Sequence, residues 1–219
     1  MMESACELSG THPVDSASDL AMVYKIVEIF HSVQGEGAHA GIPHVFIRFG
    51  KCNLQCEWCD TDFETFDEMS AVDILGEVMK FPSKRIIFTG GEPMLNDLWP
   101  LHRLFKARGY HLSCESNGTI AIPEGLLDWI CISPKDQMYP GVKIRQRTGD
   151  ELKCVYVGQE LSLYDGLLDG FTHHFLQPCY MDSETVEWNG KNFALTEAVV
   201  KESPPWRLSL QTHKWMGVD

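Results

Sequence analysis

Positive charge is scarce in this sequence. Its 18 Lys and Arg residues face 31 Asp and Glu residues, which gives a formal net charge of −13 at pH 7. A surface that binds nucleic acid needs clustered Lys and Arg side chains against the phosphates. The composition therefore argues against a nucleic-acid partner, and we expect a small-molecule ligand instead.

Long apolar runs are also missing. No stretch approaches the roughly 20 apolar residues of a transmembrane helix. Residues 1–22 contain neither the basic region nor the apolar region of a secretory signal. We therefore expect a cytoplasmic protein that makes no contact with a membrane.

The first 22 residues lack any sustained apolar period and are rich in Ser, Ala, Asp and Glu. Such a composition is typical of a mobile segment, so we predict an N-terminal extension over residues 1–22. The rest of the sequence contains no internal repeat, and a chain of 219 residues that is 44% hydrophobic can bury one sizeable core. We predict a single domain over residues 23–219.

A fourth cysteine is absent from the cysteine-rich loop, where Cys52, Cys56 and Cys59 stand in a C-x3-C-x2-C spacing. A structural zinc site needs four protein ligands, whereas a [4Fe-4S] cluster held by three thiolates keeps one iron open to another molecule. The spacing favours a catalytic iron-sulfur cluster, with a zinc or disulfide cluster that recruits another cysteine as the alternative. The remaining cysteines have apolar neighbours, and we expect buried free thiols at Cys6, Cys114, Cys131, Cys154 and Cys179.

Short apolar runs alternate with helical patterns along most of the chain, as in a parallel sheet built from βα units. Arg85–Phe88, for example, predicts a strand, Ser70 predicts the N-cap of a helix that runs to Lys80, and Gly109 is placed to end a later helix. We expect an α/β fold with a mostly parallel six-stranded sheet that forms a trimmed, open partial (β/α) barrel.

Polar and Gly-rich segments follow several predicted strands. Thr89–Pro93 reads Thr-Gly-Gly-Glu-Pro, and Ser133–Lys135 reads Ser-Pro-Lys. Parallel α/β folds place their ligands at this end of the sheet. Paired glycines let the backbone approach a ligand, and Glu92 can accept hydrogen bonds from an amine. An ordinary Gly-rich turn and a solvated Lys are the alternative interpretations.

The cysteine loop and the Thr89–Pro93 segment together resemble the radical S-adenosylmethionine (radical SAM) enzymes. In that superfamily the open iron binds the amino and carboxyl groups of SAM, and cleavage of SAM starts radical chemistry. The resemblance implies that the expected open barrel is of the radical SAM type.

Further segments resemble the 7-carboxy-7-deazaguanine synthase family over about residues 24–219. They are Phe30–Gly37, Phe46–Arg48, Cys59–Thr61, Glu115–Thr119, Ser133–Lys135, Gln177–Pro178 and Leu208–Trp215. That family converts 6-carboxy-5,6,7,8-tetrahydropterin to 7-carboxy-7-deazaguanine with loss of ammonia, on the route to queuosine and other 7-deazapurines. The resemblance implies a carbon-nitrogen lyase with a [4Fe-4S] cluster, SAM and Mg2+ as cofactors. It also implies an electron donor such as flavodoxin or ferredoxin, and a homodimer.

The same resemblance implies roles for individual residues. It gives substrate contacts to Val33, Gln34, Gly35, Arg48, Thr89 and Asp219. It gives SAM contacts to Gly91, Ser133, Pro134, Lys135, Gln177, Pro178, Cys179 and Tyr180. It gives cluster ligation to Cys52, Cys56 and Cys59, and Mg2+ ligation to Thr61. The chemistry agrees, because a guanidinium fork matches a carboxylate and Mg2+ prefers oxygen ligands.

Glu36, Glu115 and His213 are candidates for polar or proton-handling roles, with structural hydrogen bonds as the alternative for each. Two other functions stay open at this point. One is a glycyl-radical activating enzyme, against which Arg48 and Thr61 count. The other is a non-catalytic zinc-binding module.

Overall fold

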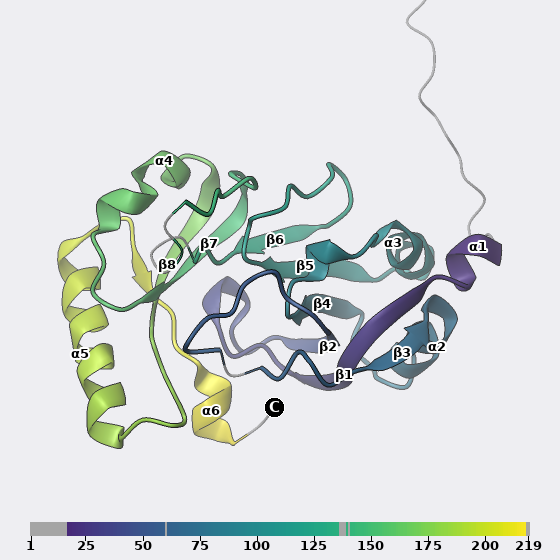
Figure 1. Ribbon diagram of the computed structural model, residues 1–219, viewed down its shortest axis with the longest axis horizontal. Helices are drawn as coiled ribbons and strands as arrows, with labels where there is room; N and C mark the ends of the chain where they lie inside the picture. The colour runs from purple at the N-terminus through teal and green to yellow at the C-terminus, as the bar shows by residue number, and fades with distance from the viewer. Residues whose placement is uncertain (1–16, 60, 136–138, 140, 218–219) are drawn as a thin grey trace, which may run out of the picture.

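The computed structural model describes residues 17–59, 61–135, 139 and 141–217. Within these residues one open sheet of nine strands runs in the order β3-β1-β2-β4-β5-β6-β7-β8-β9 (Figure 1). The strands are β1 (Val23–Val33), β2 (Pro43–Phe49), β3 (Asp67–Ser70), β4 (Arg85–Gly90), β5 (His111–Ser116), β6 (Trp129–Ile132), β7 (Gly149–Tyr156), β8 (Phe171–Pro178) and β9 (Arg207–Leu208). β1 is antiparallel to β2 and β3, and each pair from β2 to β9 is parallel.

The predicted α/β class and the open, mostly parallel sheet are confirmed, but the strand number is not. The described sheet has nine strands where six were expected. The additions include β3 with four residues and β9 with two, which are too short to show an apolar pattern. β3 forms the edge of the sheet and is antiparallel to β1, which has 11 residues.

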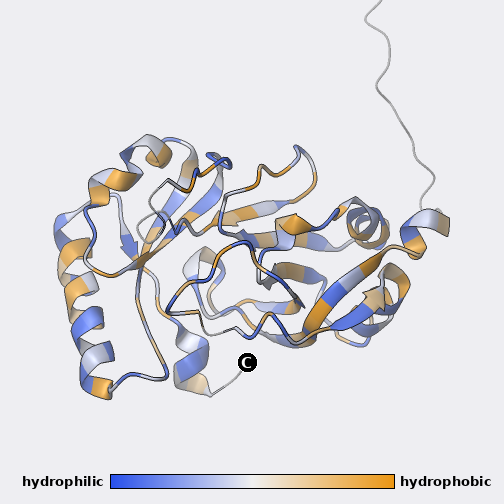
Figure 2. Ribbon diagram, viewed as in Figure 1, coloured by the Kyte–Doolittle hydropathy of each residue, from blue (hydrophilic) through white to orange (hydrophobic). Residues whose placement is uncertain are grey.

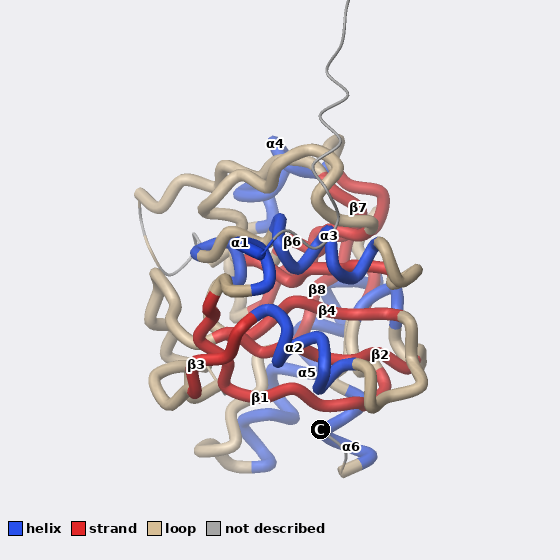
Figure 3. Tube along the Cα trace, turned by 90° about the vertical axis from the view of Figure 1, so that its right-hand side faces the viewer, coloured by secondary structure: helices blue, strands red, loops and turns tan. Residues whose placement is uncertain are grey.

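Helices α2 and α3 cover one face of the sheet near β1 and β5 (Figures 1 and 3). The described helices are α1 (Ala17–Leu20), α2 (Ala71–Val78), α3 (Trp99–Lys106), α4 (Asp165–Leu168), α5 (Val186–Glu202) and α6 (Thr212–Met216), with 3-10 turns η1 (Gly37–His39), η2 (Pro93–Leu95) and η3 (Leu161–Tyr164). Ser70 forms the predicted N-cap of α2, in a capping box with Asp73. Gly109 follows α3 with a φ of +74°, as a helix stop requires.

The hydrophobic core lies between this face of the sheet and the helices. Ile74 and Leu104 from α2 and α3 are fully buried in one cluster with Phe88, Leu112 and Leu152 from the sheet. Helix α5 instead packs on β8 and β9 at the other end of the sheet. Polar and apolar residues are mixed along it (Figure 2), so its sequence gives little helical periodicity.

The predicted extension overlaps the start of the fold. Residues 1–16 lie outside the described residues. Residues 17–20 form α1, in which Asp19 accepts hydrogen bonds from Arg103 Nε at 2.6 Å and Nη2 at 2.5 Å. Helix α1 is thus tied to α3. No described helix has the length and apolarity to cross a membrane.

Candidate active site

A cavity of about 620 Å³ opens at the carboxyl ends of the parallel strands. Its walls come from residues within the strands, such as Lys153 and Val155 of β7, from the segments that follow β1, β2, β4, β5, β6 and β8, and from the C-terminal segment. The parallel register explains the gathering, since Arg48 of β2 pairs with Thr89 of β4 and both strands end there.

Nearly all of the sequence-predicted site residues meet in this cavity. Its lining includes Val33, Gln34, Gly35, Arg48, Cys52, Cys56, Cys59, Thr61, Thr89, Gly91, Ser133, Lys135, Gln177, Pro178, Cys179 and Tyr180. Pro134 is buried between two of these residues and is not part of the lining. Asp219 lies outside the described residues.

The three cysteines of the loop after β2 are free thiols that face the cavity. Cys52 Sγ accepts a hydrogen bond from Leu54 N at 3.4 Å, and burial raises the pKa of the Cys52 and Cys56 thiols. Among the described residues, no three His, Cys, Asp or Glu side chains are grouped as a ready-made metal site. Three thiols on one short loop nevertheless fit a cluster that binds three thiolates, and binding would release their protons.

The paired glycines after β4 serve the packing of this loop. Gly91 N donates to Phe49 O at 2.9 Å, and Glu92 N donates to Lys51 O at 2.9 Å. A Cβ atom on Gly91 would lie 1.9 Å from Lys51 O, and Gly90 has a φ of +113°. Only glycine allows the two backbones to approach this closely. The sequence predicted that a ligand comes close to the paired glycines. In the structure, the backbone of the cysteine loop makes this close approach.

Glu92 is not available to a ligand amine, contrary to the sequence-based interpretation. It is fully buried, Oε1 accepts from Ser116 Oγ at 2.8 Å and Met94 N at 3.0 Å, and Oε2 accepts from Asn117 N at 2.8 Å. Burial raises its pKa, while these hydrogen bonds act in the opposite direction. Glu92 joins the ends of β4 and β5.

The segment after β5 also holds the cysteine loop. Asn117 Nδ2 donates to Asn53 Oδ1 at 2.9 Å, and Asn53 Nδ2 donates to Thr119 Oγ1 at 2.8 Å. On the other side of the loop, Gln55 N donates to Tyr139 Oη at 2.9 Å. The Glu115–Thr119 motif thus fixes the loop that carries the thiols.

Arg48 lies at the end of β2, facing the cavity. Its Nε donates to Glu28 Oε1 at 2.7 Å, and its Nη1 donates to Thr61 Oγ1 at 3.2 Å. The guanidinium lies 5.5 Å from the centre of the Phe30 ring. The two residues predicted to bind a carboxylate and Mg2+ are therefore neighbours, and Glu28 balances the charge of Arg48.

A buried ion-pair network forms one wall of the cavity, and its central residue was missed from the sequence. Lys153 of β7 lies with Nζ 2.5 Å from Glu36 Oε2 and 3.1 Å from Glu115 Oε1. Burial would raise the pKa of Glu36, but Lys153 and further donors lower it to about 2. Gln34 Nε2 donates to Glu115 Oε1 at 2.7 Å, and Gln34 Oε1 accepts from Glu36 N at 3.2 Å. Both ends of the Gln34 amide are thus bonded within the protein.

The C-terminal segment closes over the loop after β1. Gln211 Nε2 donates to Glu36 Oε1 at 2.9 Å, and Thr212 N donates to Gly35 O at 3.0 Å. A Cβ atom on Gly35 would lie 2.0 Å from His213 Nδ1, so this approach also requires glycine. Glu36 and His213, both candidates from the sequence, therefore meet at the cavity.

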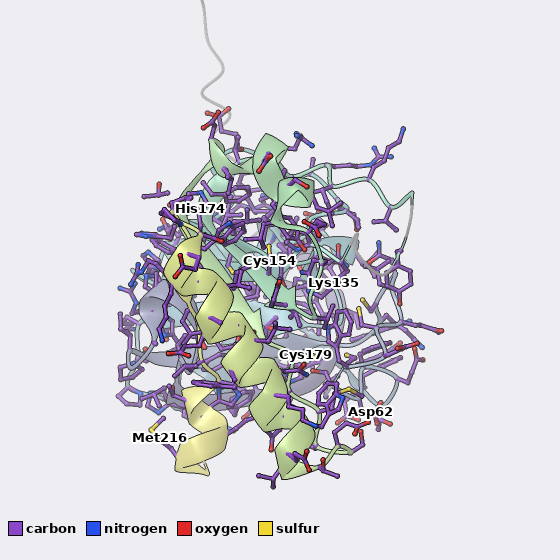
Figure 4. The ribbon with its side chains drawn as sticks, turned by 90° about the vertical axis from the view of Figure 1, so that its left-hand side faces the viewer. Asp62, Lys135, Cys154, His174, Cys179 and Met216 are labelled. Atoms are coloured by element: carbon purple, nitrogen blue, oxygen red, sulfur yellow. The ribbon has the colours of Figure 1, made fainter. Side chains whose placement is uncertain are left out.

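The residues predicted to bind SAM, apart from Pro134, also line the cavity. Lys135 Nζ donates to Ser133 O at 2.7 Å and to Ser133 Oγ at 2.6 Å, and burial lowers its pKa. Lys214 Nζ lies 4.5 Å from the centre of the Tyr180 ring. Figure 4 shows Lys135, Cys179 and Asp62, which come from three different segments of the cavity lining, on one side of helix α5.

Comparisons with known proteins define first the class of this site. Residues 46–144, which contain the cysteine loop and the segments after β4, β5 and β6, match the model of the Radical SAM superfamily. The structure resembles the crystal structure of QueE from Escherichia coli with a TM-score of 0.67 at 25% identity, covering 90% of this chain and 98% of that one.

Curated relatives narrow the class to one family. The chain is 46% identical over 198 residues to the 7-carboxy-7-deazaguanine synthase of Bacteroides thetaiotaomicron, covering 90% of this chain and all of the relative. It is 39% identical over 203 residues to the enzyme of that name from Neisseria meningitidis, covering 90% and 94%. The chain therefore belongs to the 7-carboxy-7-deazaguanine synthase family of the radical SAM superfamily.

Proposed function

We propose that this protein converts 6-carboxy-5,6,7,8-tetrahydropterin to 7-carboxy-7-deazaguanine with loss of ammonia, in the biosynthesis of queuosine and other 7-deazapurines. The observation that carries the proposal is the convergence of the three cysteines, Arg48, Thr89 and Lys135 on one cavity in a chain of this family. The cavity volume of about 620 Å³ is within the usual range for a small-molecule site.

Cys52, Cys56 and Cys59 would hold the [4Fe-4S] cluster, which together with SAM supplies the radical that abstracts hydrogen from the substrate. Gly91, Ser133, Pro134, Lys135, Gln177, Pro178, Cys179 and Tyr180 are proposed to hold SAM. Pro134 would act only by fixing the backbone between Ser133 and Lys135, since it is buried outside the cavity lining.

Substrate binding is assigned to Val33, Gln34, Gly35, Arg48, Thr89 and Asp219. Arg48 would bind the substrate carboxylate, for which its planar fork is suited. Gln34 would act chiefly by shaping the wall, because its amide is bonded to Glu115 and Glu36. A radical is unselective, so holding the substrate within reach of it is the main task of these residues.

Thr61 is proposed to supply one oxygen to Mg2+. Its hydroxyl oxygen has two lone pairs, and Arg48 Nη1 uses one of them. The pairing of Arg48 with Glu28 reduces the repulsion that a second cation would meet there.

The location, the oligomeric state, the electron donor and the domain bounds are proposals as well. We assign to the protein a cytoplasmic location, a homodimeric state, and electrons from a flavodoxin or ferredoxin. We also propose one domain over residues 23–219, preceded by an extension over residues 1–22 in which residues 17–20 form α1 and contact α3.

The deciding experiment is anaerobic reconstitution of the purified protein with iron and sulfide, followed by incubation with SAM, Mg2+, a reductant and carboxytetrahydropterin. Mass spectrometry should find 7-carboxy-7-deazaguanine and released ammonia in equal amounts. A reconstituted protein that cleaves SAM and leaves the pterin unchanged would contradict the proposal. One bound zinc and no iron would instead establish a zinc module.

A further inference from the structure

Lys153 is a buried cation that none of the proposed binding roles uses. It is only 4% exposed, and its neighbours along β7, Leu152 and Cys154, belong to the hydrophobic core on the other face of the sheet. Alternation along the strand therefore directs Lys153 into the cavity, where it is part of the lining.

The two acids bonded by Lys153 in turn accept hydrogen bonds from three segments of the chain. Glu36 Oε1 accepts from Gln177 Nε2 of β8 at 3.0 Å and from Gln211 Nε2 of the C-terminal segment at 2.9 Å. Glu115 Oε1, at the end of β5, accepts from Gln34 Nε2 of the loop after β1 at 2.7 Å. Lys153 is thus the shared partner through which these segments are joined.

The charges explain why this partner must be a cation. Glu36 and Glu115 bring two negative charges into a wall where their side chains are only 13% and 26% exposed, and Lys153 offsets one of them. The other titratable groups around the network are Glu151, Cys131, His213 and Lys135. Without Lys153 the two carboxylates would repel each other in a medium that screens charge poorly.

We propose that Lys153 is a positioning residue for substrate binding. It holds Glu36 and Glu115 in place, and these acids in turn orient the loop after β1, which contains Gln34, and the C-terminal segment. Both segments then have the orientation that substrate binding requires. This inference rests on the proposed function. Lys153 acts through the two acids, since its described hydrogen bonds go to Glu36 and Glu115 and not to the open cavity.

The principal variant is Lys153→Met, with Lys106→Met as the matched control. Lys106 Nζ also bonds a carboxylate, with Asp128 Oδ1 and Oδ2 both at 2.7 Å, but it lies on helix α3 and is absent from the cavity lining. In the reconstituted enzyme, Lys153→Met should raise the KM for carboxytetrahydropterin roughly 10- to 100-fold, the effect of one charge-assisted hydrogen bond. SAM affinity should stay within about twofold, and Lys153→Arg should recover part of the loss.

A KM for Lys153→Met within about twofold of the parent value would overturn the proposal. An equal rise in KM in Lys106→Met would overturn it as well. If the parent enzyme cleaves SAM but does not turn over carboxytetrahydropterin, the proposed function fails instead.

A second measurement needs no substrate. In the parent protein the pKa of Glu36 is lowered from 4.5 to about 2, so the stability this group contributes is complete above pH 4.5 and is lost as the pH falls toward 2. In Lys153→Met, burial without the ammonium should raise the pKa of Glu36 above 4.5, so stability should fall as the pH rises past 4.5. Thermal unfolding against pH measures this reversal, and its absence would refute the ion pair.

The variant Lys153→Met/Glu36→Gln covers the case in which the single variant does not fold. It removes both charges of the closest pair, so stability should largely return. The KM should stay high, because Glu115 still lacks its cation. Recovery of the parent KM in this variant would show that Lys153 only neutralises Glu36, and the positioning role would be wrong.

Discussion

Successive residues of β7 show how differently the two faces of the sheet are built. Leu152 and Cys154 face the helices and are fully buried in the hydrophobic core. Glu151 and Lys153 face the cavity side and are 3% and 4% exposed. All four residues are buried, but only Leu152 and Cys154 are apolar and belong to the hydrophobic core. Burial alone therefore does not separate a packed face from a binding face.

The two faces also respond differently to substitution. Burial of an apolar side chain is favourable whatever its apolar neighbours are, because the hydrophobic effect has no direction. A buried polar group needs a specific partner, and the loss of that partner leaves an unsatisfied charge or donor. The helix-facing side should thus lose stability in proportion to volume, whereas the cavity side should lose function when a single contact is broken.

The largest effect should come from Gly91→Ala, where the cavity side tolerates no added atom. The new Cβ would lie 1.9 Å from Lys51 O, and a backbone carbonyl cannot move aside as a flexible side chain can. We expect the loss of cluster incorporation and of SAM cleavage, measured by iron content and by release of 5′-deoxyadenosine.

Gly76→Ala is the matched control for this prediction. Gly76 lies in α2, and nothing stands within 4 Å of the position of its Cβ. The same substitution should there raise stability by about 0.5–1 kcal/mol, because alanine favours the helix. If both variants bind iron as the parent does, the close approach of the two backbones is not required.

Leu152→Ala tests the helix-facing side. The residue is fully buried in the core, and such truncations cost about 2–5 kcal/mol in the free energy of unfolding. KM values for SAM and substrate should stay within about twofold in the folded fraction. Val72→Ala on α2, where Val72 is 47% exposed, should change stability by less than about 0.5 kcal/mol. A large rise in KM for Leu152→Ala would contradict the view that the helix-facing side affects stability and the cavity side affects binding.

Arg48→Lys should have the next largest effect, and on binding rather than on stability. The Arg48–Glu28 pair has side chains that are 24% and 48% exposed, so it stabilises the fold by about 0–1 kcal/mol at most. A two-pronged bond from Arg48 to the substrate carboxylate should contribute more than this ion pair, and its loss should cost about 1.5–3 kcal/mol in kcat/KM. Steady-state kinetics with carboxytetrahydropterin, set beside thermal unfolding of the same variant, measure the two effects.

Glu28→Gln separates the two roles of Arg48. It removes the ion pair with Arg48 and keeps the shape of the side chain, so kcat/KM measured at saturating Mg2+ should change little. If Glu28→Gln lowers kcat/KM as much as Arg48→Lys does, Arg48 supports the fold and is not the substrate anchor.

The helix-facing side and the strand ends were largely predictable from sequence. The apolar run at Arg85–Phe88, the cap at Ser70 and the stop at Gly109 are local signals with local causes. The parallel order then brings the strand ends together, and the predicted ligand residues with them. Helix α5 was not predicted from the sequence. Among its described residues only Thr196 is buried, so no apolar stripe marks a buried face.

The network around Lys153 could not be predicted in the same way. The run Glu151-Leu152-Lys153-Cys154 alternates polar and apolar residues, which is the pattern of a strand with one face in water. Period-2 alternation does not distinguish water from a polar cavity. Lys153 is separated from Glu36 by 117 residues and from Glu115 by 38 residues of sequence, so no local pattern predicts these contacts.

The smallest effect is expected from Thr61→Val, at a half-buried residue of the cavity lining. Valine keeps the shape of threonine and removes the oxygen that accepts from Arg48 at 3.2 Å. Losing one hydroxyl ligand to Mg2+ should reduce the stimulation of turnover by added Mg2+ severalfold, on the order of 1 kcal/mol, while cluster content stays the same. Thr61→Ser keeps the oxygen and should retain the stimulation. Because both variants keep Arg48, a difference between them isolates the oxygen itself, and equal Mg2+ dependence in the two would mean that the ion binds elsewhere.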